Sequence, residues 1–149
     1  MNWTKDKSIV LSQVCVALFA ALLLALDVGC YWAVHWFINL RHMPWQSGAA
    51  FMVTIYLCSV FAWLLLFRLW KLLGNMKGGR VFVEDNVKHL RSVSWCCVWA
   101  AVICFVSCIY YLPFLFVSIA AAFMALIVRI VKNVFQQANA MKSELDFTV

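Results

Sequence analysis

Asp27 is the one acidic residue within or beside an apolar segment of this 149-residue chain. An ionisable group in hydrocarbon is costly, so it indicates an ion or proton site by default. Counted along a helix from Ser8, however, Asp27 lies about 28 Å away, near the far boundary of a ~30 Å hydrocarbon core. There water and headgroups solvate it, and Arg41 or His42 offers a charge partner. We therefore expect an interfacial, structural Asp27; neither it nor His35 has the second convergent group that acid–base catalysis needs.

Seven cysteines form the second set of versatile side chains. In a small secreted domain this number would predict disulfides, but all seven lie in or beside long apolar runs, where cysteine packs as a small apolar residue. Cys104 and Cys108 are one helical turn apart, yet no His or carboxylate accompanies them, so we expect no metal site. The sequence leaves open whether Cys30 and Cys108 pair, although both lie toward the same predicted membrane face.

The familiar catalytic patterns are missing from the sequence. It has no phosphate-binding glycine loop, no nucleophile elbow, no zincin helix and no paired carboxylates. We therefore expect neither an enzyme nor a bound cofactor.

The composition indicates which elements must position these residues. Hydrophobic residues make up 66% of the chain and charged residues 12%, whereas soluble domains are about half apolar and a quarter charged. That surplus exceeds what one aqueous core can bury, so the solvent must be lipid. We expect one all-α domain, a polytopic membrane protein with four transmembrane helices at about 8–30, 49–68, 92–111 and 113–131. The last two come from a single charge-free run that is too long for one span, and Pro113 marks where it folds back.

The positions of Lys and Arg predict an orientation. The N-terminal segment, the segment from Arg68 to Arg91 and the C-terminal tail carry eleven of them, and the opposite side carries only Arg41. The positive-inside rule then places both termini and the middle loop, 69–91, in the cytoplasm. Such a loop also attracts anionic lipid headgroups, and we expect no direct contact with nucleic acid.

The C-terminal segment 132–146 predicts a cytoplasmic amphipathic helix that extends the fourth span. From Val131 onward, apolar residues recur at three- and four-residue intervals, at Val131, Phe135, Ala138, Met141 and Leu145. Such a stripe needs a partner. The chain's own middle loop is the first choice, and a second copy, the lipid surface or another protein are the alternatives.

Two cytoplasmic segments resemble a known family. They are the closing segment 142–149, which ends in acids, Thr and an aliphatic residue, and a central signature of Lys77, Gly78, Gly79, Phe82, Glu84, Asp85, Asn86, Val87, Leu90 and Arg91. Both are similar to an uncharacterised family of bacterial four-span membrane proteins, known only as a numbered domain of unknown function. Val83 departs from the pattern, because the family usually has a Thr or Ser there that caps the third helix. Asp85 is therefore expected to take over as the cap, with a slightly later helix start.

The resemblance implies an integral protein of the bacterial cytoplasmic (inner) membrane, frequently encoded beside a small helix-turn-helix regulator, and it brings no catalytic residue. We expect a regulatory or scaffolding protein that docks a cytoplasmic partner, such as that regulator, through its basic loop and C-terminal helix. The candidate docking residues are Lys77, Arg80, Phe82, Asn86, Arg91, Phe135, Met141 and Leu145. The alternatives are a small oligomeric transporter or channel subunit with Asp27 near the pore mouth and, third, a four-span membrane transferase. For the transferase, the interiors of spans two to four lack the Arg and Glu that would hold a thiol cofactor.

Overall fold

The computed structural model describes residues 3–148, with side chains from Asp6 onward. Over this part of the chain there are four helices and no strand: α1 (Trp3–Arg41), α2 (Trp45–Lys77), α3 (Glu84–Ser107) and α4 (Phe114–Phe147). Each helix is long and apolar enough to cross a membrane. The prediction of an all-α, multi-pass membrane protein with four transmembrane helices is confirmed.

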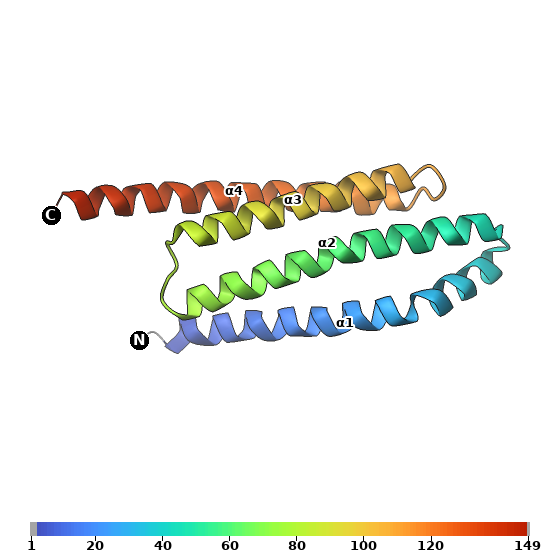
Figure 1. Cartoon of the computed structure of the whole chain (residues 1–149), viewed down its shortest axis with the longest axis horizontal. Coiled ribbons are helices and arrows are strands. Elements are labelled where there is room, and N and C mark those ends of the chain that lie inside the picture. The colour runs from blue at the N-terminus through green and yellow to red at the C-terminus, as the bar shows by residue number, and fades with distance from the viewer. Residues whose placement is uncertain (1–2, 149) are drawn as a thin grey trace.

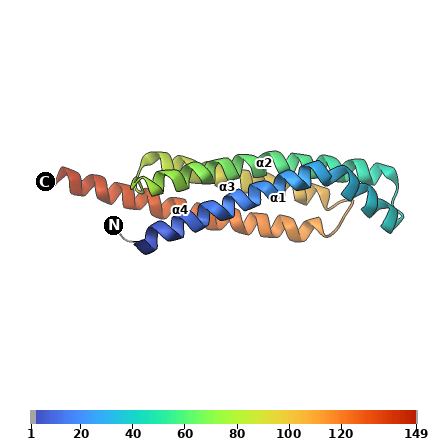
Figure 2. The ribbon, with the colours of Figure 1, turned by 90° about the horizontal axis from the view of Figure 1, so that it is seen from below.

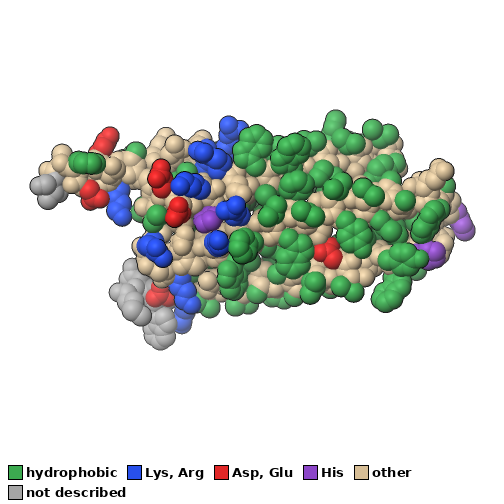
Figure 3. Space-filling view, in the orientation of Figure 1, with side chains coloured by type: hydrophobic (Ala, Val, Ile, Leu, Met, Phe, Trp, Pro, Cys, Tyr) green, Lys and Arg blue, Asp and Glu red, His purple; other side chains and the backbone are tan. Residues whose placement is uncertain are grey.

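The helices run antiparallel and pack in chain order, α1 on α2, α2 on α3 and α3 on α4 (Figures 1 and 2). One end of the bundle holds the start of α1, the α2–α3 connection and the end of α4. Lys and Arg side chains gather at this end (Figure 3), which we call the basic end. The opposite end holds the α1–α2 and α3–α4 connections, and we call it the loop end.

An aromatic cluster closes the loop end. Phe51 of α2 lies 5.1 Å, ring to ring, from Tyr111 in the α3–α4 connection and 5.5 Å from Phe114 of α4. Phe37 of α1 meets both Phe51 and Tyr111, at 5.6 and 5.8 Å. Contacts between aromatic rings add stability beyond the area that they bury, so this end joins all four helices through the α3–α4 connection.

The prediction that the chain folds back at Pro113 is confirmed. α3 ends at Ser107, and Pro113 occupies the N-cap position of α4. Proline suits this position because the first turn of a helix leaves its N–H groups without intrahelical partners.

The α2–α3 connection is shorter than predicted. α2 continues to Lys77 and α3 already begins at Glu84, so only residues 78–83 are non-helical. Gly79 has φ +76°, a left-handed conformation that favours glycine. The expected later start with Asp85 as cap is wrong, because Val83 is the N-cap without a side-chain hydrogen bond. The two acids of the first turn suit the positive end of the helix dipole instead.

Hydroxyl groups connect neighbouring helices inside the apolar bundle. Ser94 Oγ donates to the Ala125 carbonyl at 3.2 Å, and Ser118 Oγ donates to the Ala101 carbonyl at 2.8 Å. These small residues allow the backbones of α3 and α4 to approach closely, as is typical of helix pairs in membranes. The two bonds also define one antiparallel register, because a step of seven residues forward in α3 matches a step of seven residues back in α4.

Candidate functional site

Asp27 on α1 accepts hydrogen bonds from one face of α2. Ser59 Oγ donates to Asp27 Oδ2 at 2.7 Å, and Trp63 Nε1 donates to the same oxygen at 2.9 Å. Tyr56 OH donates to the Asp27 backbone carbonyl at 3.2 Å. The other carboxylate oxygen, Oδ1, is buried and has no hydrogen-bond partner in the described chain. The Asp27 carboxylate therefore has one oxygen with two hydrogen-bond donors and one oxygen with none in the described chain.

Asp27 lies deep in the predicted membrane. Its partner Ser59 is ten residues from Ala49 and eight from Phe67, the two ends of the charge-free run of α2. At 1.5 Å per residue, Asp27 is therefore level with the middle of a ~30 Å hydrocarbon core. A polar group at this depth is expensive and is a candidate for function by default.

Asp27 does not pair with Arg41 or His42, because its carboxylate accepts from Ser59 and Trp63 instead. Its contacts with α2 also indicate a deeper position than the interfacial one expected from the sequence. Counting from Ser8 treats that residue as the start of the membrane, but α1 has 39 residues. A helix of that length is about 58 Å long, nearly twice the hydrocarbon thickness, so its own ends do not determine the depth of Asp27. Its depth follows from the contacts with α2.

The cysteines are all free within the described structure. Cys58 Sγ of α2 and Cys104 Sγ of α3 approach to 3.8 Å, a hydrogen-bonding distance for sulfur. Cys30 is buried beside the aromatic cluster. Between Asp6 and Thr148 we find no group of three or more His, Cys, Asp or Glu side chains placed to hold a metal ion.

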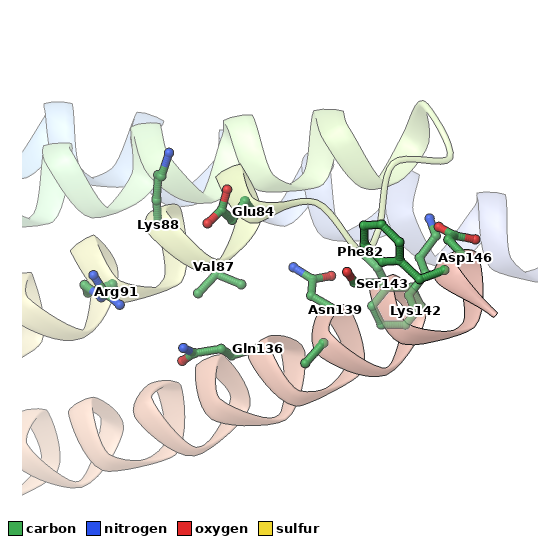
Figure 4. Close-up of a pocket in the computed structure, with 12 residues that line it drawn as sticks. Phe82, Glu84, Val87, Lys88, Arg91, Gln136, Asn139, Lys142, Ser143 and Asp146 are labelled. Carbon is green, nitrogen blue, oxygen red and sulfur yellow. The ribbon is translucent and has the colours of Figure 1, made fainter.

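A groove at the basic end separates the start of α3 from the end of α4 (Figure 4). It has a volume of about 660 Å³. Its apolar lining comes from Phe82, Val87 and Phe147. Its charged lining contains both signs: the cations are Lys88, Arg91 and Lys142, and the acids are Glu84 and Asp146. Such a mixed surface suits a polypeptide better than an apolar molecule or a highly charged ion.

Asn139 is the central polar group of this groove. Its side chain is directed from α4 toward the first turn of α3 (Figure 4). Asn139 Oδ1 is buried and has no hydrogen-bond partner among the residues described. A buried acceptor without a donor costs about 1–3 kcal/mol, so the groove has an unmet need for an N–H or O–H group.

The eight predicted docking residues divide into four groups. Phe82 and Arg91 line the groove. Phe135 packs against the groove lining, because its ring lies 6.0 Å from that of Phe82. Met141 and Leu145 are exposed on α4 outside the groove lining, at 62% and 68%.

Three residues of the central signature lie in or beside the α2–α3 connection. Lys77 ends α2, and Arg80 follows the turn at Gly79. Asn86 is fully buried, at 0% exposure, and holds this connection together. Its Nδ2 donates to the carbonyls of Arg80 and Val81 at 2.9 and 2.8 Å, and its Oδ1 accepts from Asn75 Nδ2 at 2.9 Å.

Sequence reasoning missed the polar residues of α4 that line the groove: Gln136, Asn139, Ser143 and Asp146. Polar side chains on an extended helix are usually solvent-facing, and the apolar stripe was expected to face the chain's own loop. In the structure these polar residues line the groove beside the start of α3, and the apolar stripe meets the α2–α3 connection through the contact of Phe135 with Phe82. The available signal was their spacing of three, four and three residues, which places them on one helical face.

Comparison with known proteins gives a family but no activity. No curated protein and no solved structure matches this chain. Residues 9–149 match the family model described as a protein of unknown function, DUF2975. That match includes every residue on which the two candidate sites are built. The chain is a multi-pass membrane protein that belongs to the DUF2975 family.

Proposed function

We propose that this membrane protein has a regulatory or scaffolding role and docks a cytoplasmic protein in the groove between α3 and α4. The partner that we propose is a small helix-turn-helix regulator, which the family resemblance suggests. The observation that carries the proposal is the groove itself, with the buried and unpartnered Oδ1 of Asn139 at its centre. A partner that supplies a hydrogen-bond donor there removes the cost of that unpaired acceptor.

The charge distribution supports a cytoplasmic basic end. Eleven of the twelve Lys and Arg residues lie at or beyond the boundaries of the apolar runs on that side. Excess Lys and Arg in short loops is the sign of the cytoplasmic face. The groove would then face the compartment that contains DNA-binding regulators.

The end of α4 supports a protein partner over a small ligand. The α3–α4 register places the start of α3 level with about residue 135, so the last twelve residues of α4 reach about 18 Å beyond it. This part of α4 exposes Phe147, which lines the groove, at 89%. A helix laid in the groove would cover this side chain, as in helix-in-groove recognition.

This proposal is tested by co-purification in detergent. The partner used is the helix-turn-helix regulator whose gene lies nearest to the gene of this membrane protein. We expect Asn139→Ala to weaken the complex about tenfold, the equivalent of one hydrogen bond at ~1.4 kcal/mol. Asn133→Ala is the matched control, since Asn133 is an exposed α4 residue outside the groove. Truncation after Lys132 removes α4's share of the groove and is expected to abolish capture. Unchanged binding by both Asn139→Ala and the truncated protein would refute the proposal.

A second candidate function, a small transporter or channel subunit, is favoured by one observation. Asp27 Oδ1 is buried and unpartnered near the predicted midplane, and its neighbour Ser59 lines a 240 Å³ crevice between the helices. A carboxylate in this position suits a proton or cation site. Asp27→Asn is expected to abolish proton or cation flux in liposomes and to leave the hydrogen bonds from Ser59 and Trp63 in place. Flux equal to that of the unaltered protein would rule this function out.

A further inference from the structure

Two cavities on the α3–α4 face join into one site with a charged end and an apolar end. The charged cavity has a volume of 240 Å³ and is lined by Arg91, Ser94, Trp95, Val98, Arg129 and Lys132. The apolar cavity has a volume of 480 Å³ and continues along the same two helices. Ser94, Val98 and Arg129 line both cavities, so the two are continuous.

The charged cavity has three cations and no acid in its lining. Between Asp6 and Thr148, no hydrogen bond or ion pair joins Arg91, Arg129 or Lys132 to another side chain. The ion pair of that region, Lys88 with Asp85, lies outside this lining. Three cations held together on two helices repel one another, so an anion that binds between them relieves this repulsion.

Arginine gives the cavity a preference for phosphate. Each guanidinium presents a planar set of N–H donors that binds two phosphate oxygens at once. Trp95, 58% exposed, lies beside these cations. An amphipathic indole is typical of the boundary between hydrocarbon and headgroups. The charged cavity therefore has the chemistry and the depth of a lipid headgroup site.

The apolar cavity fits a hydrocarbon chain. α3 lines it with Val98, Val102 and Phe105, and α4 lines it with Ala122 and Leu126. From Arg91 to Phe105 the site extends fourteen residues, about 21 Å along α3, which is more than half of a ~30 Å hydrocarbon core. The small side chain of Ala122 helps to leave this space open.

From this arrangement we infer that the α3–α4 face binds one anionic phospholipid, with its phosphate between Arg91, Arg129 and Lys132 and one acyl chain along Val98, Val102 and Leu126. Basic pockets between transmembrane helices bind anionic headgroups in this way. Charge complementarity selects the headgroup, and the continuous apolar cavity distinguishes a lipid from a free phosphate. The inference does not depend on partner docking in the groove.

The test measures phosphatidylglycerol bound to the full chain by native mass spectrometry from detergent, with phosphatidylcholine as the neutral lipid. We expect at least tenfold stronger retention of phosphatidylglycerol. Arg129→Gln is expected to lower its affinity at least tenfold, and Arg129→Lys is expected to keep most of it. Arg80→Gln, which removes a cation of the α2–α3 connection outside both cavities, is expected to change it less than twofold.

Ala122→Phe fills the apolar cavity without a change of charge and is expected to lower phosphatidylglycerol affinity as well. Circular dichroism and gel filtration establish that each variant is folded. Equal retention of the two lipids, or equal losses in Arg80→Gln and Arg129→Gln, would overturn the inference. Competition by glycerol phosphate at the lipid's own concentration, with no loss in Ala122→Phe, would identify a free-phosphate site and would also overturn it.

Discussion

Replacing Asn86 with alanine is expected to loosen the connection between α2 and α3. Asn86 is fully buried and makes three hydrogen bonds, two to the carbonyls of Arg80 and Val81 and one with the Asn75 amide. At a net value of about 1 kcal/mol each, their loss lowers the free energy of local opening by about 3 kcal/mol. That difference corresponds to roughly a hundredfold larger population of the open connection.

Hydrogen–deuterium exchange in detergent micelles measures this opening at a single amide. The Arg80 N–H donates to the Asn75 carbonyl at 3.0 Å across the connection, so its exchange rate reports on the structure that Asn86 holds. We expect about hundredfold faster exchange in Asn86→Ala. Asn75→Ala removes one of the three bonds and is expected to accelerate exchange about fivefold, or ~1 kcal/mol.

The control for this experiment is Asn133→Ala, which removes the same amide from an exposed position on α4. Its Arg80 amide is expected to exchange at the original rate. Unchanged exchange in Asn86→Ala would refute the assignment of Asn86 as the residue that holds the connection. Equal acceleration in Asn75→Ala and Asn86→Ala would show that the two backbone contacts contribute nothing.

Three further predictions concern stability, measured as the free energy of unfolding in mixed detergent micelles. Gly79→Ala is expected to cost about 1 kcal/mol, because a φ of +76° is strained for a residue with a Cβ atom. Thr54→Val is expected to cost about 1–2 kcal/mol, because it removes the hydrogen bonds between the Thr54 oxygen and the hydroxyls of Ser107 and Tyr110. Trp63→Phe is expected to cost about 1–2 kcal/mol, because it keeps an aromatic ring and removes the N–H bond to Asp27; an unchanged value would exclude that bond as a stabilising contact.

The spans were predictable because they depend on composition and on one proline. A charge-free run of hydrocarbon length leaves a helix in lipid as the simple solution. A run of twice that length must reverse, and Pro113 marks the place. Both arguments use neighbouring residues only, so they need no knowledge of how the helices pack.

The depth of Asp27 was not predictable for the opposite reason. It depends on the register of α1 against α2, which is determined by the bonds from Ser59 and Trp63. α1 is much longer than the membrane is thick, and many registers are compatible with its sequence. Asn86 was misjudged in a related way, because a polar residue in a basic segment suggests a surface, whereas its amide satisfies backbone groups of the connection.

One face of α4 connects the lipid site with the groove, and its spacing was already present in the sequence. Nine of the α4 residues that line the three α3–α4 cavities follow one another at alternating intervals of four and three: Ser118, Ala122, Ala125, Arg129, Lys132, Gln136, Asn139, Ser143 and Asp146. Such spacing keeps side chains on one side of a helix that packs against a neighbour. The residue type along this face changes with depth, from small residues to cations and then to amides, a hydroxyl and an acid. A search for an apolar stripe follows only the first part, because beyond Arg129 the same face turns polar.

Arg91 of α3 connects the lipid site with the groove, because it lines both the charged cavity and the groove. An anion bound in the charged cavity changes the charge that a docked protein meets. The two sites are therefore expected to be coupled.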